Sequence, residues 1–204
     1  MVRGPAAMSG VRWCDAARMN RTLDVATSYL ASVARLGCPR GGTRFRPTAQ
    51  ALGGRAMFPF LVDPNTGASL YESDAINRYL AKTYGDGRVP LALTLGPVTT
   101  SSSAFASSMR LGHGRAAQPS HAPALPLELY SYEASPYSRL AREALCELEI
   151  PYVLHDVAQG SPKRAAFETR SGKQMVPFLV DPNTDTSLFE SAEIAAYLRR
   201  TYGA

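Results

Sequence analysis

The sequence predicts an α/β protein that contains two related modules, and three observations support this. A ten-residue phrase at 57–66 (MFPFLVDPNT) returns with one substitution at 175–184 (MVPFLVDPNT), so the offset is 175 − 57 = 118 positions. At that offset, residues 54–85 and 172–203 are identical at 20 of 32 positions, which indicates an internal duplication. From residue 127 onward the pattern predicts strand, helix, strand, helix or loop, strand, strand and helix, an α/β order.

Composition excludes several function classes. The 204 residues are 45% hydrophobic and 19% charged, and no run of 18 apolar residues occurs, so we expect no membrane insertion. The net charge is +5, but residues 1–55 hold nine Arg, no Lys and two acids, which makes +7 and leaves 5 − 7 = −2 for the remainder. Because the basic character lies outside the repeated module, we expect no nucleic-acid partner.

Residues 1–37 are rich in Arg, Ala and Ser and poor in acids. This composition favours a targeting segment of the organelle transit type. Leu23, Ala26, Tyr29, Leu30 and Val33 follow helical spacing and Gly37 would suit a C-cap, so a docked helix is the alternative. Between the copies, residues 89–125 carry Gly-Pro, Ser/Thr/Ala and Pro-rich stretches, and we interpret them as a linker.

The first copy, residues 38–88, is predicted to contain a strand at 60–62, a turn at 63–67 and a strand at 69–71, which together form a hairpin. A helix follows, with Ser73 as a good N-cap, and its buried face repeats at helical spacing. The second copy, residues 126–204, repeats each of these features. The positions on the helical face of the first copy are Ile76, Tyr79, Leu80, Thr83 and Tyr84.

The second copy has additional elements at its start. Alternation at 127–132 predicts a strand, and Pro136 is tolerated at the first position of the helix that follows. We expect this helix to bury Leu140, Ala144, Leu145 and Leu148. Pro151 ends it, and residues 152–157 form the next strand. Residues 127–160 have no good counterpart in the first copy.

This order, with Pro just before the third strand and Glu-Ser at the start of the last helix, resembles the thioredoxin-like fold. It is similar to the N-terminal domain of glutathione S-transferases and to the glutaredoxins. The resemblance is complete over 127–204 but covers only the second half of the module in 38–85, so the first copy is expected to be incomplete. Its first strand and first helix have no recognisable counterpart in residues 1–37. Tandem modules of this kind are similar to a group of plant chloroplast proteins, which implies a chloroplast location, with the cytoplasm as the alternative.

The resemblance implies glutathione as the ligand and no metal. Val176 and Pro177 would form the cis-proline site, where the main chain of Val176 pairs with the cysteinyl backbone of glutathione. Glu190 and Ser191 would hold its γ-glutamyl end at a helix N-terminus. The alternative is that Pro177 only shapes a turn and Ser191 only caps a helix. The other implied glutathione-binding residues are Tyr137 and Lys173, and the first-copy equivalents are Phe58, Pro59, Glu72 and Ser73.

The position of the redox motif is occupied by serines. Where glutaredoxins carry Cys-Pro-Tyr-Cys, this sequence has SPYS at 135–138, and a hydroxyl cannot form a mixed disulfide, so dithiol exchange is excluded there. Ser135 is the candidate catalytic residue, because transferase serines donate a hydrogen bond to the glutathione thiolate. Alternatively it only caps the helix.

The other cysteines and the histidines give weak signals. Cys146 is interpreted as buried packing. There is no CxxC, so neither a disulfide framework nor a zinc site is expected, and the three histidines have no metal-ligand spacing. An exposed, reactive Cys38 is one further hypothesis.

Three functions follow from these patterns. The leading hypothesis is a glutathione-binding, transferase-like protein without the helical C-terminal domain of a full transferase, with weak or absent activity. The alternative is a catalytically inactive thioredoxin-fold module that binds a protein partner or serves as a scaffold. The third is a thiol oxidoreductase that uses Cys38.

Overall fold

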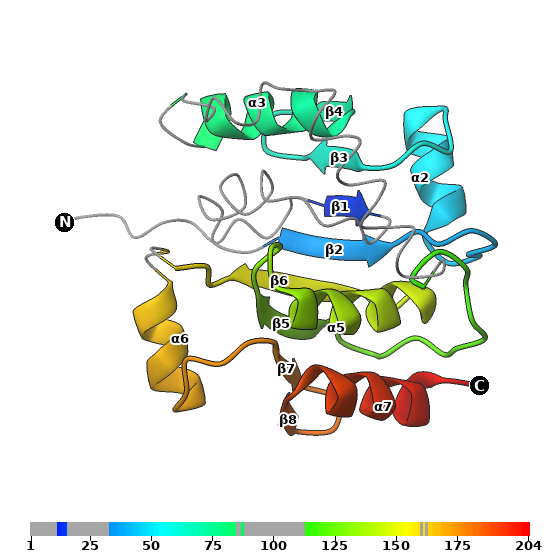
Figure 1. Cartoon of the computed structure of the whole chain (residues 1–204). Helices are drawn as coiled ribbons and strands as arrows, with labels where there is room; N and C mark the ends of the chain where they lie inside the picture. The colour runs from blue at the N-terminus through cyan, green and yellow to red at the C-terminus, as the bar shows by residue number, and fades with distance from the viewer. Residues whose placement is uncertain (1–11, 16–32, 85–86, 88–112, 160, 162) are drawn as a thin grey trace.

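Eight strands form one mixed sheet, in the order β4-β3-β1-β2-β6-β5-β7-β8 (Figure 1). The structure is a computed structural model and describes residues 12–15, 33–84, 87, 113–159, 161 and 163–204. The elements, in chain order, are β1 (Arg12–Asp15), β2 (Val33–Gly37), α2 (Arg46–Gly53), β3 (Phe60–Asp63), β4 (Ala68–Tyr71), α3 (Ser73–Tyr84), β5 (Leu127–Ser131), α5 (Pro136–Glu147), β6 (Tyr152–Asp156), α6 (Arg164–Ser171), β7 (Phe178–Asp181), β8 (Thr186–Phe189) and α7 (Ser191–Tyr202).

The second copy confirms the predicted fold class. Its four strands lie in the order β6-β5-β7-β8, with β5 parallel to β6 and antiparallel to β7. A parallel pair needs a crossover, which α5 provides, whereas β7 and β8 are joined by a short turn. This βαβ unit followed by a hairpin and a helix is the thioredoxin-like arrangement.

With β1 and β2, which precede residue 38 and are counted with the first copy from here on, that copy has the same strand order, β2-β1-β3-β4, and here the structure differs from the sequence analysis. We expected no counterpart of the first strand within residues 1–37, but β1 pairs parallel with β2 and antiparallel with β3. The strand RWCD is only four residues long and has charged residues at both ends, so it shows no apolar alternation. Its strand conformation depends on pairing with neighbours far along the chain.

The helical spacing predicted around Leu23 to Leu30 lies outside the described residues. Its last position, Val33, begins β2, and Gly37 ends this strand instead of capping a helix. Any targeting role of this segment stays a prediction.

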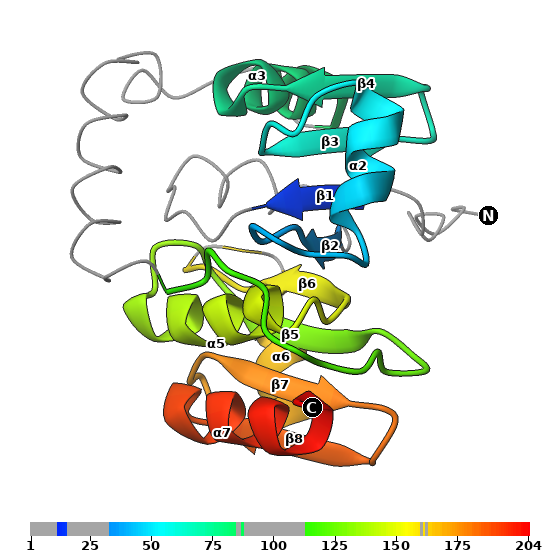
Figure 2. The same ribbon diagram turned by 90° about the vertical axis from the view of Figure 1, so that its right-hand side faces the viewer.

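The two copies meet at their edge strands. β2 and β6 pair antiparallel, with Val33 opposite Leu154 and Arg35 opposite Tyr152, and this pairing joins two four-stranded sheets into one. Because β2 and β6 run in opposite directions, equivalent ends of the two copies lie at opposite edges of the sheet (Figure 2). The join also removes two exposed strand edges, which are otherwise prone to aggregation.

Alternation along β5 builds two cores, one on each face of the sheet. Leu127 and Leu129 pack with α5 and α7 in the larger cluster, whereas Tyr130 points to the other face and packs with Phe167 of α6 and Phe178. The larger cluster includes Ala144, Leu145 and Leu148 as predicted, but Leu140 is only partly buried.

The end of the predicted linker is docked on both copies. Arg40 and Ala116 form a parallel bridge, Ser120 and Gly203 form an antiparallel one, and Arg44 of the first copy donates to the carbonyl of Ser120 at 2.8 Å. Residues 88–112, most of the linker, are outside the described part. None of the described helices is long and apolar enough to cross a bilayer.

Candidate functional site

Three segments of the second copy converge at one edge of the sheet. Tyr130, near the end of β5, lies opposite Phe178, which begins β7, and Phe178 lies opposite Phe189, which ends β8. The loop after β5, the segment before β7 and the start of α7 therefore meet where these strands end. These three segments carry the residues that the sequence analysis selected from separate stretches: Ser135, Tyr137, Val176, Pro177, Glu190 and Ser191.

The first proline of the repeated phrase follows a cis peptide bond in each copy. These bonds are Phe58–Pro59 in the first copy and Val176–Pro177 in the second. Pro177 is buried, and Val176 is half-buried against the aromatic cluster of Tyr130, Phe167 and Phe178. The predicted cis-proline geometry is therefore present in both copies.

The residue before each final helix has an unusual backbone. Glu190 has φ 64° and Glu72 has φ 68°, a region that residues other than glycine rarely occupy. Glu190 is the N-cap of α7, and its side chain makes no capping hydrogen bond. Ser191 is the first residue inside the helix, so the expectation that this serine is the N-cap is wrong. In the first copy α3 likewise begins at Ser73, and the Ser73 side chain is outside the described part.

Ser135 caps α5. Its Oγ accepts a hydrogen bond from the backbone amide of Ser138 at 3.1 Å, and the residue is only 2% exposed. Ser135 is therefore the N-cap of α5, and its catalytic role stays a prediction. A serine hydroxyl that accepts one hydrogen bond keeps its own proton for donation. Tyr137, in the first turn of α5, is 64% exposed.

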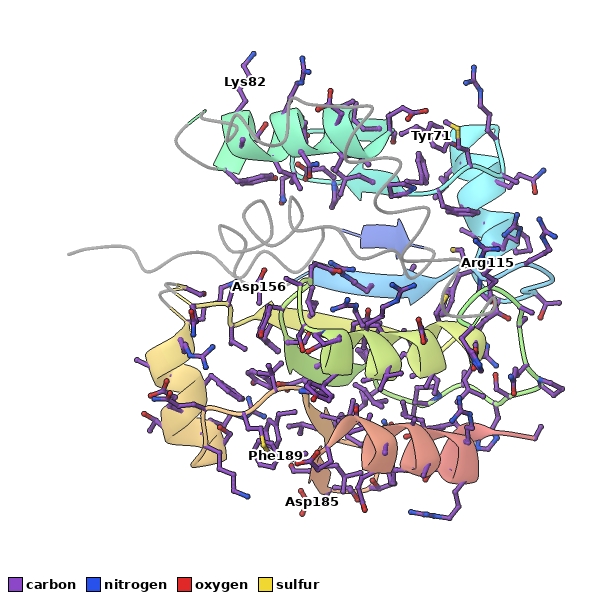
Figure 3. All side chains as sticks on the ribbon, viewed as in Figure 1. Tyr71, Lys82, Arg115, Asp156, Asp185 and Phe189 are labelled. Carbon is purple, nitrogen blue, oxygen red and sulfur yellow. The ribbon has the colours of Figure 1, made fainter. Side chains whose placement is uncertain are left out.

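Lys173 lies on the segment between α6 and the cis-proline. Its Nζ stands 5.1 Å from the ring centroid of Phe189. Phe189, which is labelled in Figure 3, ends β8. Two hydrogen bonds hold this segment against α6: Arg164 donates to the carbonyl of Gln174 at 2.9 Å, and Ser171 donates to the carbonyl of Lys173 at 2.8 Å. The cation–π contact places a positive charge beside the converging segments.

A hydrogen-bond network explains why the phrase ends in Asp-Pro-Asn-Thr. Asp181 accepts from the hydroxyls of Tyr197 at 2.8 Å and Tyr202 at 2.5 Å, and from the backbone amide of Asn183 at 2.8 Å. The network ties the hairpin turn to the final helix. The sequence analysis missed it, although the signal was present as an Asp and two Tyr at the same spacing in each copy. The corresponding residues of the first copy are Asp63, Asn65, Tyr79 and Tyr84.

These hydrogen bonds shift the pKa values of the groups that make them. Burial raises the pKa of Asp181, but the hydrogen bonds from Tyr202, Asn183 and Tyr197 outweigh it, and the pKa lies below its ordinary value of 3.8. In the first copy, burial and the hydrogen bond to Asp63 raise the pKa of Tyr84 to about 12. The carboxylates are thus held ionised, which is a structural role.

A second polar cluster lies on the α6 face of the second copy. Glu128 approaches His155 Nε2 at 3.2 Å and Arg170 Nη1 at 3.2 Å, and Tyr130 donates to Glu128 at 2.9 Å. Burial lowers the pKa of His155, with the charge of Glu128 acting in the opposite direction. Among the described residues, no group of three or more His, Cys, Asp or Glu could hold a metal ion.

Cys38 differs from its prediction. It is disulfide-bonded and 1% exposed, so the hypothesis of an exposed reactive thiol there is wrong. The sequence analysis, which expected no disulfide framework, did not predict this bond. The sequence carries no signal for it, because the three cysteines are widely spaced and form no CxxC. Cys146 is a buried free thiol, as predicted.

A family model and a solved structure match parts of the chain. A family model described as "Glutathione S-transferase, N-terminal domain" matches residues 31–88 and 129–204, which is more than half of the chain. A solved structure of the glutathione transferase BmGSTD1 from Bombyx mori, in complex with GTT, is 26% identical with a TM-score of 0.36. The alignment covers 41% of this chain and 39% of that one. No curated protein matches the chain. The chain therefore belongs to the glutathione S-transferase N-terminal domain family.

Proposed function

We propose that the chain binds glutathione at the second copy. The observation that carries this proposal is the convergence of three segments at one edge of the sheet: the start of α5, the cis Val176–Pro177 bond and the start of α7. Membership of the glutathione S-transferase N-terminal domain family supports it.

Each segment offers a group that suits one part of the tripeptide. The N-terminus of α7 carries partial positive charge and favours the γ-glutamyl carboxylate, while the exposed Glu190 carboxylate can pair with the ammonium group. The main chain at Val176 would pair with the cysteinyl unit as an added strand does. Tyr137 and Lys173 flank the site as exposed side chains.

The chemistry proposed at this site is weak transferase activity. The N-terminus of α5 favours a thiolate, and Ser135 lies at that terminus with a proton to donate. Its burial limits access to the hydroxyl, which supports low activity. Because positions 135 and 138 are both serine, this edge offers no dithiol.

The second candidate function is an inactive interaction or scaffold module. The capping bond of Ser135 favours it, because that bond gives the serine a structural role without any ligand. The two candidates differ in one measurable property, the affinity for glutathione.

Isothermal titration of the full chain with millimolar glutathione tests the proposal. Ser191→Ala and Glu190→Gln should each weaken binding about tenfold, because each removes a group that would contact a charged end of the ligand. Glu72→Gln, the matched change in the first copy, should leave the second site unchanged. No heat with the unmodified chain would refute glutathione binding and favour the scaffold function.

A further inference from the structure

A buried ionic cluster crosses the junction between the two copies. Arg35, on β2 of the first copy, places Nη2 2.6 Å from Oε1 of Glu133, which lies in the loop after β5 of the second copy. Arg142, on α5, places Nη2 3.1 Å from the other carboxylate oxygen of Glu133. The side chains of Arg35, Glu133 and Arg142 are 3%, 1% and 4% exposed. One carboxylate is therefore held between two guanidinium groups that come from different copies.

The same cluster is also hydrogen-bonded to the backbone of the loop that leads to Ser135. Arg142 donates to the carbonyl oxygens of Tyr132 at 3.3 Å and of Glu133 at 3.2 Å. The amide of Ser135 donates to the carbonyl of Tyr132 at 3.3 Å, which closes the turn. The position of Ser135, and of the first turn of α5 that it caps, depends on where Glu133 is held.

The positive charge of Arg35 is found only in the first copy, at the junction, and is not a shared feature of the two copies. Arg12 and Glu128 are equivalent, because they lie opposite the matching residues Val62 and Val180. On the other side Arg12 lies opposite Ala34 and Glu128 opposite Val153, so the next residues, Arg35 and Leu154, are also equivalent. Leu154 is a buried core residue. A buried arginine is costly unless it is paired, and it cannot escape by losing its proton. Its presence on β2 is accounted for by Glu133 across the junction.

We propose that Arg35 is a positioning residue for the site of the second copy. By fixing Glu133 it fixes the turn 132–135, and so the affinity of the second copy for glutathione is set in part by the first copy. This inference rests on the proposed function, since it concerns the same site. It gives the first copy a regulatory role that does not require a ligand of its own.

Arg44 provides a matched control. It is also an arginine of the first copy that reaches across the junction, and it donates to the carbonyl oxygens of Leu148 at 3.1 Å and Glu149 at 2.8 Å. These acceptors follow the C-terminal end of α5, whereas Ser135 caps its N-terminal end. Losing either arginine weakens the junction, but only the loss of Arg35 should disturb the turn before Ser135.

The experiment compares Arg35→Met, Arg35→Lys and Arg44→Met in the full chain. Glutathione affinity is measured by calorimetry, and amide hydrogen exchange of residues 132–138 is measured without ligand. We expect Arg35→Met to weaken binding about tenfold and to speed exchange in 132–138, Arg35→Lys to restore part of both, and Arg44→Met to change neither. If Arg35→Met does not fold, Arg35→Lys and Glu133→Gln carry the same comparison, with smaller changes expected.

The outcomes separate this inference from the function on which it rests. Equal effects of the Arg35 and Arg44 variants on binding and on exchange would overturn the positioning role, even if the unmodified chain binds glutathione. If the unmodified chain produces no heat, glutathione binding is refuted. In that case exchange alone decides the positioning role: a selective effect of Arg35→Met on residues 132–138 supports it, and equal effects overturn it.

Discussion

Replacing Asp181 by Ala should destabilise the chain strongly, because this buried carboxylate accepts four hydrogen bonds. The donors are the hydroxyls of Tyr197 and Tyr202 and both nitrogens of Asn183, at 2.5 to 2.8 Å. Hydrogen bonds to a charged group contribute about 1.5–3 kcal/mol each. Because the four share one acceptor, they are not additive, and we expect a loss of about 4 kcal/mol in the free energy of unfolding.

The assay is urea unfolding followed by far-ultraviolet circular dichroism, with a double-mutant cycle. Tyr202→Phe alone should cost about 2 kcal/mol, since it removes one hydrogen bond to a carboxylate. In the Asp181→Ala background the same change should cost well under about 1 kcal/mol, because its acceptor is gone. Equal costs of Tyr202→Phe in both backgrounds would refute the network as the source of stability, as would a loss below about 1 kcal/mol for Asp181→Ala.

The pH dependence gives an independent check of the same reasoning. The folded-state pKa of Asp181 lies below its ordinary value of 3.8, so its stabilising contribution is present above that pH. It is lost as the pH falls through the folded pKa. Unfolding free energies of the unmodified chain and of Asp181→Ala should therefore converge in acid below about pH 3.8. A constant difference from pH 7 to pH 2 would contradict an ionised Asp181.

Three further predictions concern other parts of the fold. Gly37→Ala should destabilise the junction by about 1–3 kcal/mol in thermal unfolding, because an added Cβ would lie 2.7 Å from Cα of Cys146 on α5. His155 should titrate below pH 6.5 by nuclear magnetic resonance, and Glu128→Gln should lower its pKa further, since burial favours the neutral ring and Glu128 opposes this. Iodoacetamide should label Cys38 only after reduction, and labelling of Cys38 in the unreduced, denatured chain, located by peptide mapping and so distinguished from Cys146, would contradict its disulfide.

Sequence patterns predicted the second copy well because its elements carry strong local signals. The hairpin turn, the proline at the start of α5 and the helical spacing of Ile194, Tyr197 and Leu198 each arise within a few residues of chain. The cis-proline geometry was implied by the family resemblance, and the structure contains it at both sites. The functional roles of these residues are still predictions.

The failures concern features that depend on distant partners. β1 has no pattern of its own and is a strand because β2 and β3 flank it. Charged residues at helical spacing usually indicate a solvated face, yet Arg139, Arg142 and Glu143 of α5 are all buried. Neither the helix propensity nor the hydrophobic periodicity of a segment can show that other elements cover both the apolar and the charged face of the helix.

The divergence between the two copies follows from the way they meet. The most similar stretch, 54–85 with 172–203, forms β3, β4 and α3 and their counterparts β7, β8 and α7, which lie at the outer ends of the sheet. There the contacts are mainly within each copy, so the same residues can form the same contacts in both copies.

The inner strands and α5 form the junction, where the two copies must be complementary and cannot be identical. Arg35 is paired with the acidic Glu133, and a second arginine there would repel it. Residue 37 has to be glycine, because α5 approaches it closely at Cys146. The register equivalents of these two residues in the second copy are Leu154 and Asp156. The loss of similarity between the copies in this half therefore has a physical cause, which is the shared sheet. The segments that have diverged include Arg35, which pairs with Glu133 in the loop before Ser135.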